Sequence, residues 1–256
     1  MRKTFKPSNL TTFKPYCLTI AASDTSGGAG IQRDLKTFHD IGVRGISVIT
    51  GITAQTDEKV YFAEALDETT VDIQCNTLFE NHEISAVKIG VVFNRKIMDK
   101  ITHYLEKYLL NHIVIDPIIH ASNAYTFLNE KDFIHLRDTF LKKATLITPN
   151  IPELERLSDM PVRNEQQLIK AANFLSEKYD SYVFVKGGHL FIANEVNDYL
   201  IRKNTTECFS SINKHLSDVH GTGCLISSAI TAYLACGDNI NDAIKKAKEY
   251  FYSVLP

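Results

Sequence analysis

Six short runs of apolar and β-branched residues recur along the chain, and amphipathic stretches separate them. The runs span residues 17–22, 45–54, 85–92, 112–118, 144–149 and 181–188, and two of the amphipathic stretches are residues 29–42 and 164–179. Continuous apolar runs are typical of parallel strands that helices cover on both faces of a sheet. The alternation therefore predicts an α/β fold with a mostly parallel central sheet flanked by helices.

The pattern changes after residue 188. The stretch "NDYLIRKNTTECFSS" predicts two short strands around a polar turn, and helical periodicity resumes after Gly223. No repeat, low-complexity tract or Pro/Ser-rich linker divides the 256 residues, and one open α/β sheet commonly reaches this size. We therefore expect an N-terminal tail over residues 1–16 and a single domain over residues 17–256.

Charge and cysteine usage narrow the class of partner. The formal net charge is −2, with both signs mixed along the chain, so no footprint for nucleic acid or an anionic membrane is visible. No segment supplies the roughly 18 consecutive apolar residues of a membrane span. The five cysteines and nine histidines show no metal-binding spacing. These observations predict a cytoplasmic protein with reduced thiols that acts on small molecules.

Two glycine-rich turns precede predicted helices. One begins "SDTSGGAGIQRDL" at residues 23–35, and the other is "HGTGC" at residues 220–224. Glycine lets the backbone approach a ligand closely, and the free N–H groups at a helix start suit phosphate. Neither turn matches the G-x-G-x-x-G or G-x-x-x-x-G-K-[ST] patterns, which disfavours a nicotinamide enzyme and a Walker-type ATPase. A plain strand-to-helix turn is the structural alternative for the first.

Polar residues stand where the predicted strands end. They are Gln55, Asp116, Asn150, Glu153 and Lys186. Open α/β sheets bind ligands at the carboxyl ends of their strands. A lysine that ends a buried strand suits a phosphate contact, and two acids suffice for Mg²⁺, which keeps several of its waters. For Asn150 and Glu153 a helix capping box is the structural alternative.

The motifs "SDTSGGAGIQRDLK", "KIGVV", "IDPI", "ITPNIPE", "VKGGH" and "HGTGC" follow one another in a specific order. In this order, over residues 17–253, the chain resembles the hydroxymethylpyrimidine and phosphomethylpyrimidine kinases of thiamine biosynthesis, in the ribokinase-like superfamily. The resemblance implies a ribokinase-like three-layer fold and a cytoplasmic homodimer. It also implies ATP- and Mg²⁺-dependent phosphorylation of 4-amino-5-hydroxymethyl-2-methylpyrimidine and of its monophosphate.

The resemblance also implies roles for individual residues. Substrate binding falls to polar groups that read the pyrimidine ring and apolar groups that line it: Asp34, Gln55, Ala22, Val91 and Ile118. The resemblance implies that the nucleotide phosphates are bound by Lys186, Thr222, Gly223 and Asn150, and that Mg²⁺ is bound by Asp116 and Glu153. Catalysis falls to Cys224, Lys186, Gly221 and Gly223. Cys224 matches the proposed catalytic base, and we expect the helix that begins there to lower the pKa of its thiol.

Several positions depart from the family pattern. Ala22 replaces a glycine, Val91 replaces a methionine, and the loop over residues 120–127 carries Asn123 and Ala124 where relatives have Ser-Gly. Tyr125 and Phe127 are bulkier than the family residues. These changes keep two alternatives open: a pyridoxine or pyridoxal kinase, and a catalytically silent protein that binds the pyrimidine.

Overall fold

The computed structural model describes residues 14–56, 58–120, 125–187, 195–212 and 222–254. These residues form one nine-stranded sheet in the order β3-β2-β1-β4-β5-β6-β7-β8-β9. The strands are β1 (Tyr16–Asp24), β2 (Arg44–Gln55), β3 (Val60–Ala65), β4 (Ile84–Ile89), β5 (Ile113–Ile115), β6 (Leu146–Ile147), β7 (Tyr182–Val185), β8 (Glu195–Arg202) and β9 (Thr205–Ile212). Neighbours from β2 to β7 pair in parallel, whereas β3, β8 and β9 pair antiparallel.

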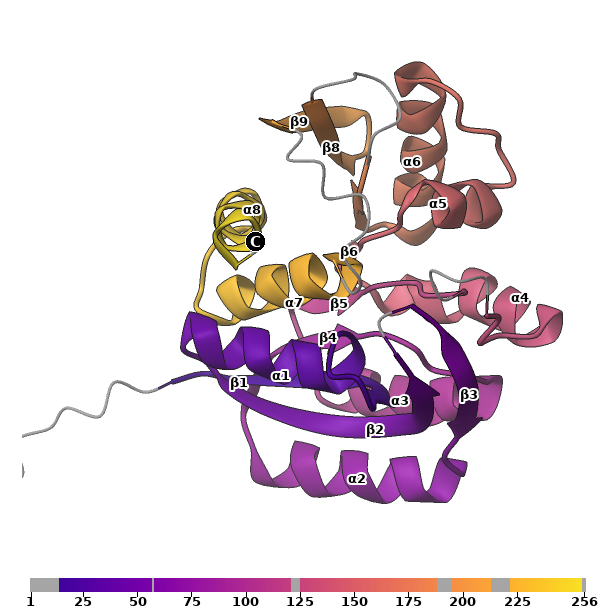
Figure 1. Ribbon diagram of the computed structural model, residues 1–256, viewed down its shortest axis with the longest axis vertical. Coiled ribbons are helices and arrows are strands. Elements are labelled where there is room, and N and C mark those ends of the chain that lie inside the picture. The colour runs from indigo at the N-terminus through magenta and orange to yellow at the C-terminus, as the bar shows by residue number, and fades with distance from the viewer. Residues whose placement is uncertain (1–13, 57, 121–124, 188–194, 213–221, 255–256) are drawn as a thin grey trace, which may run out of the picture.

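Most of the helices connect strands of the sheet, and the last two follow the final strand (Figure 1). They are α1 (Gly30–Ile41), α2 (Glu68–Asn81), α3 (Arg95–Lys107), α4 (Glu130–Asp138), the 3₁₀ turn η1 (Phe140–Lys143), α5 (Ile151–Ser158), α6 (Glu165–Tyr179), α7 (Thr222–Ala235) and α8 (Ile240–Val254). Within the described ranges, no helix has the length and apolar character that crossing a membrane requires. The predicted α/β fold is confirmed.

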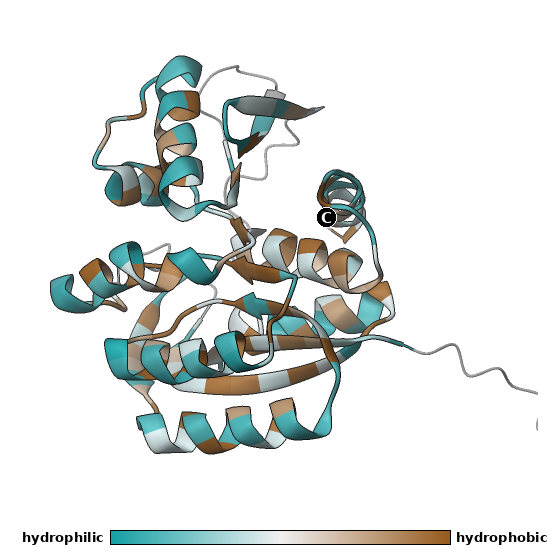
Figure 2. Ribbon diagram, turned by 180° about the vertical axis from the view of Figure 1, so that it is seen from behind, coloured by the Kyte–Doolittle hydropathy of each residue, from teal (hydrophilic) through white to brown (hydrophobic). Residues whose placement is uncertain are grey.

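Alternate strand residues point into two separate apolar layers, as the period of a strand requires. In β4, Val87 and Ile89 pack with helices α2 to α6 in the larger core. Ala86, which precedes Val87 and points to the opposite face of the sheet, packs instead with α1 and α7. In β7, Val183 and Val185 belong to the larger core, and Phe184 faces α7 and α8. The brown apolar segments of Figure 2 accordingly concentrate on the strands and on the inner sides of the helices.

The strand predictions were correct in number and place for the parallel sheet, with shorter strands than expected at its centre. The fourth and fifth runs form β5 and β6, of three and two residues. Directly after them, the backbone N–H groups of Asp116 and Thr148 still donate to the neighbouring strand, but Pro117 and Pro149 lack an N–H for a further ladder bond. The hairpin expected after residue 188 is confirmed as β8 and β9, and β3 was not predicted. Most of the predicted tail, residues 1–13, lies outside the described residues.

Candidate active site

The carboxyl ends of β5, β6 and β7 bring three predicted site residues together. Asp116 follows β5, Asn150 follows β6, and Lys186 follows β7. Asn150 and Lys186 form a parallel backbone bridge, and the backbone N–H of Asp116 donates to Ile89 O of β4 over 2.9 Å. The start of α7 lies against this edge, because a Cβ added to Gly223 would sit 3.8 Å from Asp116 Oδ2.

Asp116 and Lys186 form a buried ion pair. Lys186 Nζ donates to Asp116 Oδ1 over 2.8 Å, and the side chains are 17% and 1% exposed, respectively. Thr148 Oγ1 also donates to Oδ1, over 3.1 Å, and Ser227 Oγ of α7 donates to Oδ2 over 3.2 Å. Burial alone raises the pKa of Asp116, but the positive charges of Lys186 and Lys88 outweigh it and hold the pKa below its ordinary value.

Lys186 keeps its charge in this setting. Burial alone lowers the pKa of Lys186, but the carboxylates of Asp116 and Glu153 raise it above its ordinary value. Gly223 adjoins the ammonium group, since a Cβ at that position would lie 3.2 Å from Lys186 Nζ. A permanently charged donor therefore lies at the N-terminal end of α7. Of the other residues predicted in this turn, Thr222 is described only as the first residue of α7, and Gly221 lies outside the described residues.

Asn150 and Glu153 form the capping box that was one of their two interpretations. Asn150 Oδ1 accepts from the backbone N–H of Glu153 over 2.8 Å, and Glu153 Oε2 accepts from the backbone N–H of Asn150 over 2.9 Å. Burial raises the pKa of Glu153 to about 7, against the lowering effect of the Lys186 charge. Glu153 Oε1 has no hydrogen-bond partner within the described part of the chain. The cap thus leaves one carboxylate oxygen available.

Cys224 lies in the first turn of α7, almost completely buried. The backbone N–H of Gly30, the first residue of α1, donates to its sulfur. The expectation that the helix start lowers the thiol pKa was wrong. Burial raises the pKa of Cys224, and the carboxylates of Asp34 and Asp116 add to the increase, which Lys88 only partly offsets. In the free protein the thiol is therefore protonated at neutral pH.

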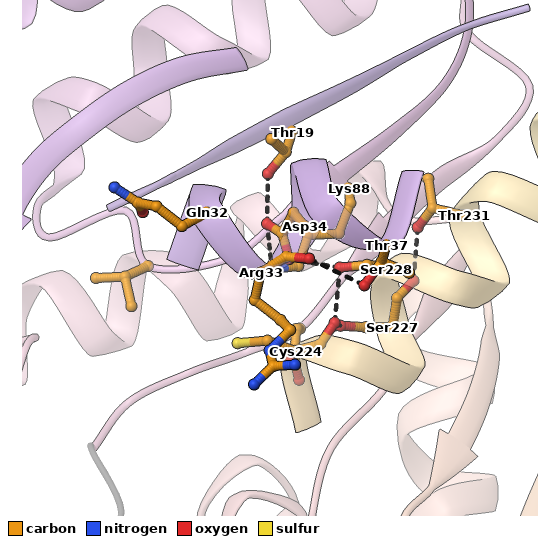
Figure 3. Close-up of polar contacts among 12 residues, drawn as sticks. Thr19, Gln32, Arg33, Asp34, Thr37, Lys88, Cys224, Ser227, Ser228 and Thr231 are labelled. Carbon is orange, nitrogen blue, oxygen red and sulfur yellow. Dashed lines mark hydrogen bonds and ion pairs between the residues drawn. The ribbon is translucent and has the colours of Figure 1, made fainter. Parts of the chain in front are cut away.

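A second buried ion pair lies beside the first, and the sequence analysis did not identify it. Lys88 Nζ of β4 donates to Asp34 Oδ2 of α1 over 2.8 Å and to Oδ1 over 3.0 Å, and both side chains are fully buried. Thr19 of β1 donates to Asp34 Oδ2 over 2.5 Å, and Ser228 of α7 donates to Oδ1. Figure 3 shows the carboxylate of Asp34 between Thr19 and Ser228.

This arrangement bears on the predicted role of Asp34. Its carboxylate is directed at Lys88, Thr19 and Ser228, so a contact with a pyrimidine ring would require it to leave these partners. Burial alone lowers the pKa of Lys88, but the carboxylate of Asp34 raises it above its ordinary value. Lys88 therefore keeps its positive charge although it is fully buried.

The three apolar residues predicted to line a substrate ring do come together. Ala22 and Val91 form a buried cluster with Phe93, and Ile118 and Phe127 pack against it. The rings of Phe93 and Phe127 meet edge to face with centroids 5.9 Å apart. Gln55 lies half-buried at the end of β2, where its backbone is bound by Thr25 Oγ1. Within the described part of the chain its side-chain amide has no hydrogen-bond partner.

The first glycine-rich turn is a tightly bonded loop. Asp24 accepts from the backbone N–H groups of Ser26 and Ala29 over 2.8 and 2.7 Å. Gly30 has φ +58°, and a Cβ there would lie 2.3 Å from Ala22 O, so only glycine fits. Ala29, the N-cap of α1, makes no side-chain cap bond. The turn thus brings the N-terminal end of α1, which has no side-chain cap, against Cys224.

Comparisons with known proteins agree with this site. A family model described as phosphomethylpyrimidine kinase matches residues 24–255. The hydroxymethylpyrimidine/phosphomethylpyrimidine kinase of Staphylococcus aureus (strain MRSA252) is 35% identical over 234 residues, which cover 91% of this chain and 85% of that protein.

Solved structures of related kinases superpose well. The crystal structure of phosphomethylpyrimidine kinase from Clostridium difficile 630 has a TM-score of 0.84 and 37% identity, and covers 95% of this chain and 100% of that one. An ADP complex of Bacillus subtilis pyridoxal kinase also has a TM-score of 0.84, with 31% identity over 93% of this chain and 90% of that one. By the extent of these matches, the chain belongs to the phosphomethylpyrimidine kinase family.

Proposed function

We propose that this protein transfers the γ-phosphoryl group of ATP to the hydroxymethyl group of 4-amino-5-hydroxymethyl-2-methylpyrimidine and then to the resulting monophosphate. Family membership supports the reaction class, and 35% identity to the Staphylococcus aureus kinase supports this substrate. One observation carries the proposal for the site: the charged Lys186 lies beside Gly223 at the start of α7. Because glycine has no side chain, Gly223 leaves the ammonium group of Lys186 more accessible to a phosphate than any other residue at position 223 would.

Lys186 and α7 would act together on the transferred group. The first N–H groups of a helix have no partner within it and carry partial positive charge, so they bind anions. A phosphoryl group at this end would receive hydrogen bonds from these groups and from Lys186. Such donors, fixed before the reaction, stabilise the charge that spreads over the phosphoryl oxygens in the transition state.

Cys224 is proposed to contact the substrate hydroxyl. Its raised pKa supports a hydrogen-bonding role in the free protein, with proton acceptance only once substrate is in place. Phosphoryl transfer has a loose transition state that depends more on positioning than on deprotonation. The bond from Gly30 N–H would then stabilise a thiolate formed late in the reaction.

ATP is the proposed nucleotide, and the ADP complex of the Bacillus subtilis relative supports a nucleotide site in this fold. Asp116 and Glu153 are the proposed Mg²⁺ residues. Within the described ranges, no three histidine, cysteine or acidic side chains are grouped to hold a metal ion. Two carboxylates nevertheless fit Mg²⁺, which binds through one or two acids, waters and substrate phosphates. Glu153 Oε1, which has no hydrogen-bond partner among the described residues, would accept a hydrogen bond from such a water.

The apolar cluster around Ala22, Val91 and Phe93, with Gln55 at the end of β2, is the proposed ring site. Asp34 stays a candidate for ring contact only if it changes partners. A pyridoxal kinase is the second candidate function, because the Bacillus subtilis pyridoxal kinase superposes with the same TM-score as the Clostridium difficile enzyme. A homodimer and a cytoplasmic location are also proposed, and the five free cysteines support a reducing compartment.

An ADP-release assay with MgATP tests the proposal. The purified protein is given hydroxymethylpyrimidine, its monophosphate or pyridoxal, and Cys224→Ala serves as the active-site control. Turnover of both pyrimidines, at least tenfold lower in the control, is the expected result. Turnover of pyridoxal alone would move the protein to the second candidate function. Ligand binding without ADP release from any of the three would reject the kinase proposal.

A further inference from the structure

The two buried ion pairs are built from the same four parts. Each lysine, Lys88 or Lys186, bonds an aspartate, and each aspartate also accepts from a threonine of the sheet. These threonines are Thr19 within β1 and Thr148 directly after β6. Each aspartate accepts a third bond from one of two consecutive serines of α7, Ser227 or Ser228.

A glycine also adjoins each ammonium group. A Cβ at Gly90 would lie 3.1 Å from Lys88 Nζ, and one at Gly223 would lie 3.2 Å from Lys186 Nζ. The two ion pairs differ in solvent exposure: the Lys186 side chain is 17% exposed, whereas the Lys88 side chain is fully buried. The Lys88–Asp34 pair therefore cannot touch a substrate in this conformation.

Stability alone does not account for such a pair. Removing two charges from water costs several kcal/mol per ion, and apolar side chains of similar volume usually pack at least as well. A lysine is almost never fully buried unless it is paired. The pair must therefore act through the residues it contacts, and those contacts lead to Cys224.

Two links join the pair to Cys224. Ser228 Oγ, which bonds Asp34, also lies 2.6 Å from the backbone oxygen of Cys224 and so ties the first turn of α7 to α1. The second link is charge. The groups that face the thiol are Lys88 from β4, Asp34 and the Gly30 N–H from α1, Asp116 after β5, and Lys186 after β7. Among the charged groups acting on the thiol, Lys88 has the largest effect that favours a thiolate.

We propose that Lys88 and Asp34 are positioning residues for Cys224: Asp34 fixes Lys88 and, through Ser228, the first turn of α7, and Lys88 supplies the buried positive charge that lets Cys224 become negative. The importance of this charge for turnover rests on the proposed kinase function, but its effect on the thiol does not. In this arrangement Lys186 binds the phosphate, and Lys88 acts on Cys224.

The rate of alkylation of Cys224 by iodoacetamide tests the proposal without substrate. Only the thiolate reacts, so at one pH below the pKa a variant with a higher thiol pKa has less thiolate and reacts more slowly. Mass spectrometry of the peptide that carries Cys224 separates it from the other cysteines. We expect Lys88→Met to slow alkylation at least tenfold at pH 8. Equal rates in this variant and the unmodified protein would overturn the proposal.

Matched variants separate charge from folding. Lys248→Met removes another buried lysine, which pairs with Asp198 over 2.5 Å and is not among the largest influences on the Cys224 thiol, and should leave the rate at Cys224 unchanged. If Lys88→Met does not fold, Asp34→Asn combined with Lys88→Met leaves no unpaired charge. Because Lys88 acts on the thiol more strongly than Asp34 does, this double variant should also slow alkylation, though by less. An alkylation rate in the double variant equal to that of Lys248→Met would contradict the proposal.

Activity gives an independent readout. Lys88→Met should lower kcat at least tenfold with little change in the KM of the pyrimidine, whereas loss of a ring contact would raise KM. A slowed alkylation without any pyrimidine turnover in the unmodified protein would reject the kinase and keep the pairing of Lys88 with Cys224. A normal alkylation rate in Lys88→Met with a lowered kcat would keep the kinase function and reject the effect of Lys88 on the Cys224 thiol.

Discussion

Gly223 leaves open the space in which any other residue would crowd Lys186. A Cβ at position 223 would lie 3.2 Å from Lys186 Nζ, closer than such contacts normally are. Lys186 Nζ also donates to Asp116 Oδ1 over 2.8 Å, and the added Cβ would lie 3.8 Å from Oδ2 of the same carboxylate. The second glycine of the "HGTGC" turn is therefore favoured by the neighbouring ion pair, because its φ lies outside the left-handed range that favours glycine.

Gly223→Ala should lower kcat/KM for ATP at least tenfold while the protein stays folded. The added methyl group displaces the ammonium group from the place where a phosphate would meet it. Steady-state kinetics with varied MgATP measure the effect. Cys236→Ala, at the opposite end of α7 and exposed, is the control and should match the unmodified protein. Equal kcat/KM in the two variants would remove Gly223 from the phosphate site.

Lys186→Met should abolish measurable turnover and also destabilise the fold. It leaves the Asp116 carboxylate buried without its partner, at a cost of about 3 kcal/mol. For a chain of this size the melting temperature should fall by roughly 6–12 °C. Asp116→Asn combined with Lys186→Met should recover most of that loss in a thermal melt but none of the activity. Recovery of activity would show that Lys186 only balances a charge.

Glu153 should make stability fall as pH rises from about 4.5 to 7. Burial raises its pKa to about 7 in the folded protein, against 4.5 as its ordinary value, so the folded state binds the proton more tightly across this window. Ionising the group therefore costs stability, at most about 3 kcal/mol. Glu153→Gln keeps an acceptor for the cap and removes the titration.

The measurement for Glu153 is the difference in melting temperature between the two proteins at several pH values. Between pH 5 and pH 7.5 the melting temperature of the unmodified protein should fall relative to that of Glu153→Gln. A difference that stays constant with pH would contradict the raised pKa.

Asp198→Ala should weaken ATP binding more than it slows the chemical step. Asp198 Oδ1 accepts from the backbone N–H of Gly187 over 3.0 Å, and its other oxygen binds Lys248 of α8. The carboxylate thus fixes the backbone just after Lys186. We expect KM for ATP to rise several-fold with kcat changed less than threefold. Glu207→Ala, at a partly exposed acid on the neighbouring strand β9, is the control. An unchanged KM would place Asp198 in a structural role only.

Val91→Met should favour the pyrimidine over pyridoxal. The longer side chain fills space in the cluster with Ala22 and Phe93, and pyridoxal carries more ring substituents than the aminopyrimidine. One or two added methylene-sized groups change specificity by about tenfold. The ratio of kcat/KM for the two substrates measures the change. A ratio that is unchanged would mean that this cluster does not contact the ring.

The sheet was predictable because its central strands are buried on both faces and read as apolar runs. β3 was missed because Tyr61, Phe62 and Glu64 are exposed on an edge strand, where no apolar run or strict alternation marks it. The predicted ends of β5 and β6 lay several residues beyond the observed ends, because apolar residues continue past the last paired residues of these strands.

Lys88 was missed although the sequence contained its signal. It stands between Val87 and Ile89 in an apolar run, and the argument applied to Lys186, that a lysine in a buried strand needs a partner, applies to it equally. Its partner Asp34 is 54 residues away, so only the fold could reveal the pair. The thiol pKa of Cys224 was misjudged for a related reason, because burial by α1 and β4 outweighs the effect of the helix start.

The consecutive positions of Ser227 and Ser228 limit how this protein can diverge. Neighbouring helical residues point about 100° apart, so a single helix reaches two carboxylates on different elements only while its register holds. One inserted or deleted residue in the first turns of α7 would disconnect both serines at once. Natural variants of this chain should therefore tolerate length changes in its surface loops and none between Gly223 and Ser228.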